Sequence, residues 1–305
     1  MCGIVGLFAK SADVEQRLGA HLGAMLAQMA DRGPDSAGVA LYREPAPAGT
    51  TKYSLYSPDP REDWAALGDA EVHSSHAVVA LADAEAERVL GERPQLQVVS
   101  AGRRIEMFKE AIDPREFVAR FGLDRMAGSH GLGHTRMATE SRVTTAGAHP
   151  FSTGLDLCLV HNGSLSNHNR LRLQLRREGI EFKTANDTEV AAGYLTWRLR
   201  EGDTLQAALE RCLVDLDGFY TFTVGTADGF AVLRDPIACK PAVMAETDEW
   251  VAMASEYRAI AVLPGAADAR VWEPEPARVY AWERAGDREA PPLAPPAAEA
   301  EAAVA

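Results

Sequence analysis

The second residue of the sequence, Cys2, would become the first residue if Met1 were removed. Its thiol would then lie beside a free α-amino group. Such an amine titrates at about 7.7–8.0, near the pH at which a general base works best, and a free thiol titrates at about 8.5. One residue would thus supply both a nucleophile and its base. Position alone also allows Cys2 to be an incidental small apolar residue.

An Asn-Gly pair, Asn162 and Gly163, closes the apolar run at 155–162. An asparagine amide and a glycine N–H can point at one oxygen atom, which is what an oxyanion hole requires. Glycine also lets the backbone approach a substrate closely. The same dipeptide is typical of a hairpin turn, so taken in isolation it fits either interpretation.

Two residues of opposite charge add a candidate substrate site. Arg136 lies late in a strand-like segment, where its planar fork suits a carboxylate, although it can equally be a structural arginine. Asp187 lies where a helix is expected to begin, either as the N-cap or as the partner of an ammonium group. A carboxylate binder and an ammonium binder together would recognise the head group of an α-amino acid.

The remaining polar motifs have weaker chemical meaning. Residues 32–36 (RGPDS) join a helix to a strand, as a substrate lid or as a turn. His134 and His149 suit bases, metal ligands or structural residues. His73 and His76 lack Cys or carboxylate companions at ligand spacing, so no metal site is expected. The sequence contains neither the common phosphate-binding loops nor the serine-hydrolase elbow.

Hydrophobic patterning predicts the elements that position these residues. Strands are expected at 2–9, 131–138 and 155–162, and a hairpin at 218–235. Helices are expected at 14–30, 114–121, 166–177, 187–200 and 203–216, the last capped by Asp203. Residues 43–129 are expected to be an inserted elaboration. Many strands with grouped helices favour a layered α+β architecture.

Composition limits the class of protein. The 305 residues are 47% hydrophobic and 25% charged, which is typical of a globular chain with a sizeable core. The 31 Lys plus Arg against 44 Asp plus Glu give a net charge of −13, so nucleic acid is not expected as a partner. No apolar stretch approaches the roughly 18 residues of a membrane span, so no membrane association is expected.

Cysteine usage and the two ends of the chain suggest a location. The cysteines at 2, 158, 212 and 239 show no close pairing, which is typical of a reducing compartment. The first residues do not form a secretory signal, so we expect a cytoplasmic protein. Residues 285–305 are rich in Pro, Ala and Glu and are expected to form a disordered tail after a domain at 2–284.

The motifs taken together resemble those of class II glutamine amidotransferases, which are N-terminal-nucleophile hydrolases with a four-layer αββα sandwich. The matching segments, in order, are CGIVG at 2–6, RGPDSAG at 32–38, GHTR at 133–136, HNG at 161–163 and NDTE at 186–189. Later segments also match, namely DGFY at 217–220, RDP at 234–236 and SE at 255–256. This resemblance implies the same four-layer α+β fold.

The resemblance also implies a reaction. Cys2 would attack the side-chain amide of L-glutamine, and Asn162 and Gly163 would hold the oxyanion. A γ-glutamyl thioester would form and be hydrolysed, so the products would be glutamate and ammonia.

The resemblance further implies which residues bind the substrate. Arg136 would grip the α-carboxylate and Asp187 the α-amino group. His134 and Thr135, in the same motif as Arg136, are predicted to contact the substrate as well.

A narrower resemblance concerns the acceptor of the ammonia. The segments 134–154, 161–169 and 234–248, with the insertion at 43–129, are similar to the stand-alone amidotransferase subunit of N-methylglutamate synthase, which is related to the amidotransferase part of glutamate synthase. This similarity implies synthase partner subunits that bind FMN and an iron–sulfur cluster and make N-methylglutamate from methylamine. No cofactor is expected in this chain, since it has no Cys cluster.

Two other functions stay open at this point. An independent N-terminal-cysteine amide hydrolase, such as an acylase, would use the same nucleophile, although its substrate need not carry both charges of an amino-acid head group. A catalytically idle regulatory or scaffold subunit would need none of these residues. An amidotransferase subunit of a glutamate synthase-like enzyme is a further alternative within the family.

Overall fold

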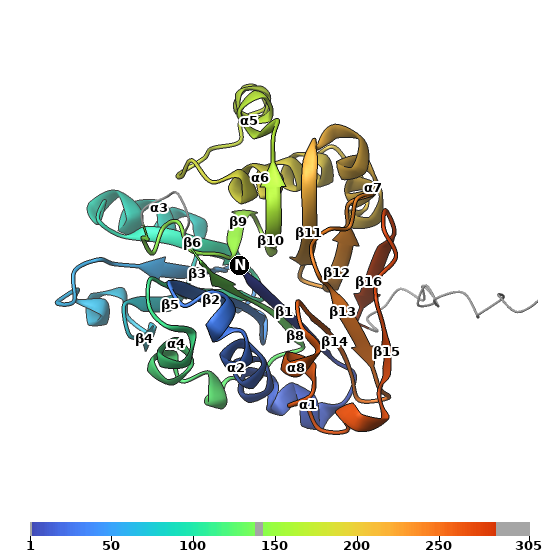
Figure 1. Ribbon diagram of the computed structural model, residues 1–305. Helices are drawn as coiled ribbons and strands as arrows, with labels where there is room; N and C mark the ends of the chain where they lie inside the picture. Colours follow the sequence, from blue (N-terminus) through green and yellow to red (C-terminus); the bar gives the residue numbers. More distant parts are fainter. Residues whose placement is uncertain (1, 138–142, 285–305) are drawn as a thin grey trace, which may run out of the picture.

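Two stacked antiparallel β-sheets form the centre of the molecule, and helices cover their outer faces (Figure 1). The computed structural model describes residues 2–137 and 143–284. Met1 and the predicted tail at 285–305 lie outside the described residues. The four layers confirm the predicted αββα sandwich.

The first sheet contains the N-terminal strand. Its seven strands run in the order β15 (Arg270–Trp272), β13 (Val243–Glu246), β14 (Trp250–Ala254), β1 (Gly3–Ala9), β8 (His130–Arg136), β2 (Ser36–Tyr42) and β7 (Ile105–Glu110). The second sheet has the order β16 (Val279–Glu283), β12 (Gly229–Arg234), β11 (Gly218–Gly225), β10 (Leu157–Leu165) and β9 (Phe151–Gly154).

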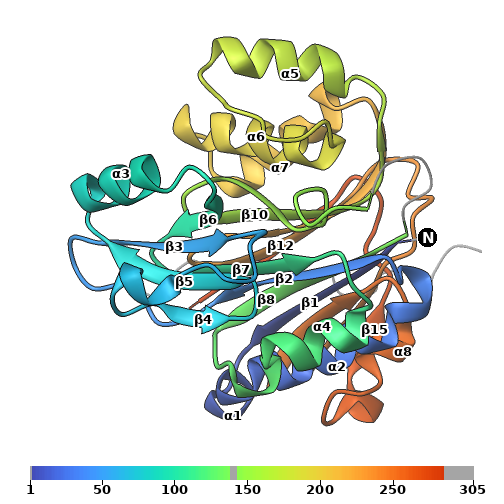
Figure 2. The ribbon, with the colours of Figure 1, turned by 90° about the vertical axis from the view of Figure 1, so that its left-hand side faces the viewer.

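Helices are divided between the two outer faces (Figure 2). Next to the first sheet lie α1 (Ala12–Gln16), α2 (Leu18–Gln28), α4 (Pro114–Phe121) and α8 (Tyr257–Ile260). Next to the second sheet lie α6 (Asp187–Arg200) and α7 (Leu205–Asp215), and α5 (His168–Arg177) packs on α6. Short 3₁₀ helices cover Ala30–Arg32, Trp64–Leu67, Leu123–Arg125 and Ala266–Asp268.

Strand β1 is buried on both faces, which explains its continuous apolar sequence. Ile4 and Phe8 pack between the two sheets. Val5 and Leu7, which alternate with them, pack under the helices of the first sheet. Because successive side chains of a strand point to opposite faces, a strand in the middle of a four-layer stack needs apolar residues at every position.

The expected elaboration at 43–129 contributes to two parts of the fold. Its own four-stranded sheet has the order β4 (Glu71–His73), β5 (His76–Leu81), β3 (Thr51–Tyr56) and β6 (Gln97–Gly102), covered by α3 (Asp83–Glu92). Strand β7 follows this sheet in the chain and pairs with β2 of the first sheet. The insertion is therefore continuous with the edge of the first sheet (Figure 2).

Two details of the helix predictions are wrong. The helix expected at 14–30 is two helices, because the chain breaks at Arg17 and brings Gly19 against the turn at 123–126, where a Cβ on Gly19 would lie 2.1 Å from the carbonyl oxygen of Leu123. The cap of α7 is Thr204, whose hydroxyl accepts from the N–H of Ala207. Asp203, the predicted cap, instead forms ion pairs with Arg198 and Arg211.

Candidate active site

A cavity of about 180 Å³ opens where β1 begins, beside the end of β8, the middle of β10 and the start of α6. The described residues that line it are Cys2, Arg136, Met137, His149, His161, Asn162, Gly163, Asn186, Asp187 and Thr188. Five of the residues predicted from the motifs, although spread over 185 positions of the sequence, thus share one cavity.

The backbone of Cys2 is held from two sides. Its carbonyl oxygen accepts a hydrogen bond from Arg32 Nε at 3.0 Å and from Asn162 Nδ2 at 3.4 Å. Arg32 in turn forms an ion pair with Glu256, and the hydrogen bond from Arg32 lowers the pKa of this carboxyl. The Arg32 motif therefore anchors Cys2, a role that was neither of the two suggested by its sequence.

The residues after Cys2 are equally fixed. The N–H of Ile4 donates to Ser255 Oγ at 2.9 Å, and the N–H of Ser255 donates to the carbonyl oxygen of Ile4 at 3.0 Å. A Cβ on Gly3 would lie 2.7 Å from Met29 Cβ and 2.8 Å from Thr135 Oγ1, so no side chain fits there. No local pattern indicated Ser255 as a partner of β1, because the two segments are about 250 residues apart.

Asn162 and Gly163 lie inside β10 rather than in a turn. The strand continues to Leu165 and pairs with β11 throughout, so the hairpin-turn interpretation is wrong. Gly163 has φ +150°, and a Cβ there would lie 2.0 Å from the carbonyl oxygen of Phe219, so only glycine fits. The Asn162 amide donates one N–H to Cys2 and has a second N–H to offer. Asn162 and Gly163 thus present hydrogen-bond donors beside Cys2.

Asp187 is not the N-cap of α6, because Asn186 is. The side-chain oxygen of Asn186 accepts from the N–H of Thr188 at 2.8 Å. Asp187 Oδ2 accepts from the N–H of Leu165 at 2.9 Å, which fixes the carboxylate at the cavity wall.

Arg136 lines the same cavity at the end of β8. Its Nη1 donates to the carbonyl oxygen of Gly147 at 3.1 Å. The cavity therefore presents a guanidinium and a carboxylate together with the cysteine.

A hydrogen-bonded chain of side chains runs behind Asp187. His161 Nδ1 lies 3.8 Å from Asp187 Oδ1 and shares a hydrogen bond of 2.9 Å with Thr188 Oγ1, which shares another of 3.0 Å with His149 Nε2. Burial lowers the pKa of both His149 and His161, so these rings are neutral at pH 7. Thr188, which links the two rings, was not predicted; its place directly after Asp187 was the signal available.

His134 and Thr135 do not line the cavity, although the sequence suggested substrate contacts for both. Thr135 points to the opposite face of β8 from Arg136 and donates to the carbonyl oxygen of Met29 at 3.0 Å, because adjacent side chains of a strand alternate. His134 is deeper in the strand and is bonded to the carbonyl oxygen of His161 at 3.1 Å. Burial lowers the pKa of His134 to about 3. Both residues therefore hold backbone carbonyl groups of neighbouring segments rather than facing the cavity.

The described residues contain neither a cluster of metal ligands nor a membrane-spanning helix. Within residues 2–137 and 143–284, no group of three or more His, Cys, Asp or Glu side chains is placed to hold a metal ion. No helix in the same ranges is long and apolar enough to cross a bilayer.

Known proteins resemble this chain in sequence. Residues 134–262 match the family model of a glutamine amidotransferase domain. The glutamine amidotransferase-like protein GlxB of Rhizobium meliloti (strain 1021) is 56% identical over 297 residues, which cover 93% of this chain and 98% of that protein. The amidophosphoribosyltransferase of Archaeoglobus fulgidus is 37% identical over 144 residues, which cover 46% of this chain and 31% of that protein.

Solved structures resemble it in fold. The glutamine phosphoribosylpyrophosphate amidotransferase of B. subtilis superposes with a TM-score of 0.62 at 21% identity, over 93% of this chain and 48% of that enzyme. This chain thus spans about half the length of the solved enzyme. The motif order, the four-layer sandwich and the near full-length relative agree, and the chain therefore belongs to the class II glutamine amidotransferase family.

Proposed function

We propose that this enzyme hydrolyses the side-chain amide of L-glutamine at Cys2 and passes the ammonia to a separate synthase subunit. One observation carries the proposal: Cys2, the Asn162–Gly163 pair and two side chains of opposite charge, Arg136 and Asp187, line a single cavity. Few substrates other than an α-amino acid with a side-chain amide would use all five groups.

The reaction begins at the Cys2 sulfur. The sulfur attacks the amide carbon while the α-amino group freed by loss of Met1 takes the thiol proton. Asn162 and Gly163 stabilise the negative oxygen of the tetrahedral intermediate. The proton then passes to the leaving nitrogen, and the C–N bond breaks to release ammonia. Water attacks the resulting thioester, which frees glutamate and the thiol.

Arg136 and Asp187 select the substrate. A bidentate bond from the guanidinium would hold the α-carboxylate, and the Asp187 carboxylate would hold the α-ammonium. Cavity walls that carry both charges speak against an acylase, whose substrate does not need them. The presence of Cys2 with both oxyanion donors speaks against an idle scaffold subunit.

The acceptor we propose is a synthase of the N-methylglutamate type. The segments 134–154, 161–169 and 234–248 support it through their resemblance to the amidotransferase subunit of that enzyme. FMN and the iron–sulfur cluster would then belong to the partner subunits, with methylamine as the co-substrate. A glutamate synthase-like acceptor is the second candidate.

Replacing the nucleophile gives the first prediction. Cys2→Ala should lower glutamine hydrolysis by at least ~1,000-fold, since Cys2 is the one thiol among the described residues that line the cavity. Ammonia release measured with purified enzyme checks this. Cys239→Ala is the matched control, because this cysteine is exposed and lies away from the cavity. Undiminished turnover in Cys2→Ala would show that the nucleophile is misassigned.

Replacing the carboxylate binder gives the second. Arg136→Lys should raise KM for glutamine by about tenfold and change kcat much less, because a point charge replaces a bidentate fork. Steady-state kinetics with glutamine from 0.1 to 100 times the wild-type KM separate the two constants. An unchanged KM would contradict the assigned role.

The third prediction concerns the partner. Adding synthase subunits and methylamine should raise glutamine turnover by about tenfold or more. The expected cause is a loop that closes over the site and completes it when the partner is bound. Turnover is measured with and without each addition, and N-methylglutamate is identified by mass spectrometry. Equal turnover in all four mixtures would argue against this acceptor.

A further inference from the structure

The loop at 144–150 forms one wall of the substrate cavity and holds the substrate-binding arginine. His149 of this loop lines the cavity, and the carbonyl oxygen of Gly147 accepts a hydrogen bond from Arg136 Nη1 at 3.1 Å. The position of the loop therefore influences where the guanidinium lies.

A buried lysine on β7 holds this loop. Lys109 is 7% exposed, and its Nζ donates to the carbonyl oxygens of Ala146 at 3.1 Å, Ala148 at 2.9 Å and Pro150 at 3.4 Å. Two of these carbonyls stand on either side of Gly147. The ammonium group thus fixes the peptide groups that flank the carbonyl bonded to Arg136.

The strand next to β7 leaves space for the loop. Gly38 on β2 is directly opposite Lys109. A Cβ on Gly38 would lie 2.1 Å from the carbonyl oxygen of His149 and 2.7 Å from Lys109 Cβ. The loop therefore packs directly on the backbone of β2, where the side chain of Lys109 can reach its carbonyls.

A second residue of β7 adds another attachment. The hydroxyl of Thr145 donates to Glu110 Oε1, and Glu110 Oε2 accepts from Ser75 Oγ at 2.6 Å. Ser75 belongs to the turn between β4 and β5 of the inserted sheet. The insertion and the substrate loop are therefore connected through β7.

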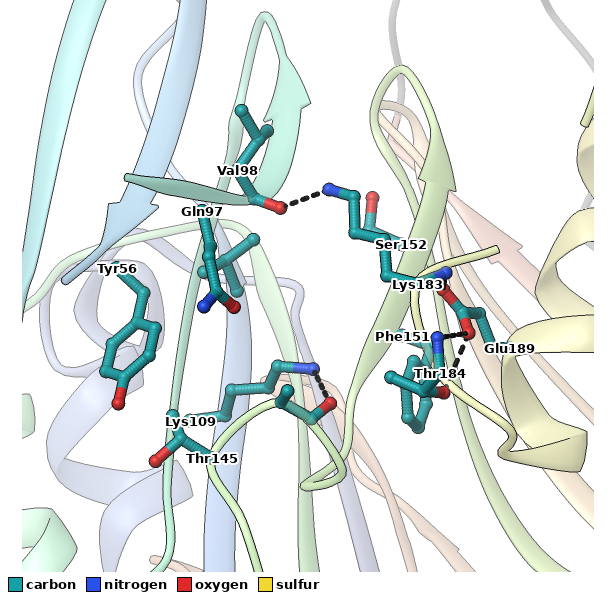
Figure 3. A pocket seen from close by; sticks show the side chains of 12 residues that line it. Tyr56, Gln97, Val98, Lys109, Thr145, Phe151, Ser152, Lys183, Thr184 and Glu189 are labelled. Atoms are coloured by element: carbon teal, nitrogen blue, oxygen red, sulfur yellow. Dashed lines mark hydrogen bonds between the residues drawn. The ribbon is translucent and has the colours of Figure 1, made fainter. Parts of the chain in front are cut away.

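Lys109 also borders a small second cavity of about 50 Å³ between β6 and the segment before α6 (Figure 3). Lys183 enters it from the other side, and its Nζ donates to the carbonyl oxygen of Val98 at 2.7 Å, away from the loop (Figure 3). Burial lowers the pKa of Lys109 to about 7, so placing an amine here has an energetic cost that an apolar side chain would avoid.

We propose that Lys109 is a positioning residue for substrate binding. It holds the Ala146 and Ala148 carbonyls, so that the Gly147 carbonyl keeps Arg136 oriented toward the α-carboxylate of glutamine. This inference rests on the proposed function of Arg136. An arginine side chain loses much rotamer freedom when it binds, and a prior contact that fixes its orientation reduces this loss.

The first test compares two lysines of the same cavity. Lys109→Met keeps an unbranched side chain that is one atom shorter and removes the three donors, and it should raise KM for glutamine by about tenfold with kcat within about threefold. Lys183→Met, the matched control, should leave both constants unchanged. Thr145→Val, which keeps Lys109 and removes the other attachment, should raise KM in the same direction by about threefold, and it serves if Lys109→Met does not fold.

The second test uses a substrate without the carboxylate. 4-Aminobutanamide keeps the amide and the amine of glutamine, and Lys109→Met should hydrolyse it with the same kcat/KM as the wild type. A merely structural role would lower kcat/KM for both substrates. The double variant of Lys109→Met and Arg136→Lys should show no higher KM for glutamine than Arg136→Lys alone, because both changes act on one contact.

These results separate the inference from the function on which it rests. An unchanged KM in Lys109→Met and Thr145→Val, an equal loss with both substrates, or additive effects in the double variant would overturn the role of Lys109. A wild type without glutaminase activity, or an unchanged KM in Arg136→Lys, would instead overturn the proposed function and with it this inference.

Discussion

The site depends on the fixed position of the first residues of β1. A nucleophile at the end of a chain has few covalent restraints, and chain ends are ordinarily poorly ordered. Here Arg32 and Asn162 both donate to the Cys2 carbonyl. Two residues later, the N–H of Ile4 donates to Ser255. These contacts hold Cys2 by its carbonyl oxygen, and the proposed chemistry uses other atoms of the residue, namely its thiol and its nitrogen.

Much of this arrangement was predictable from the sequence, because it depends on residues that are close together in the chain. The apolar run of β1, the helix at 114–121 and the hairpin at 218–235 depend on neighbouring residues, and the structure confirms them. The ordered motifs likewise indicated which residues meet in one cavity. The family and the four-layer fold followed from that order, and the comparisons agree.

Other features depend on contacts that a local pattern does not contain. Arg32 and Glu256 are far apart in the sequence, so their joint support of Cys2 was not visible. Thr135 was expected to contact the substrate because it adjoins Arg136, but the alternation of β8 directs it to the other face. Residues 43–129 were expected to be an inserted elaboration, and no local pattern indicated that β7 carries Lys109 to the loop that holds Arg136.

The central claim is that the Cys2 sulfur at the start of the mature chain carries the acyl group of glutamine. Peptide mapping by mass spectrometry after treatment with a glutamine-mimicking alkylating agent tests it most directly. We predict one adduct, on an N-terminal peptide that begins with Cys2, and protection of that peptide by excess glutamine. An adduct on Cys158, Cys212 or Cys239, or a mature chain that keeps Met1, would contradict the account.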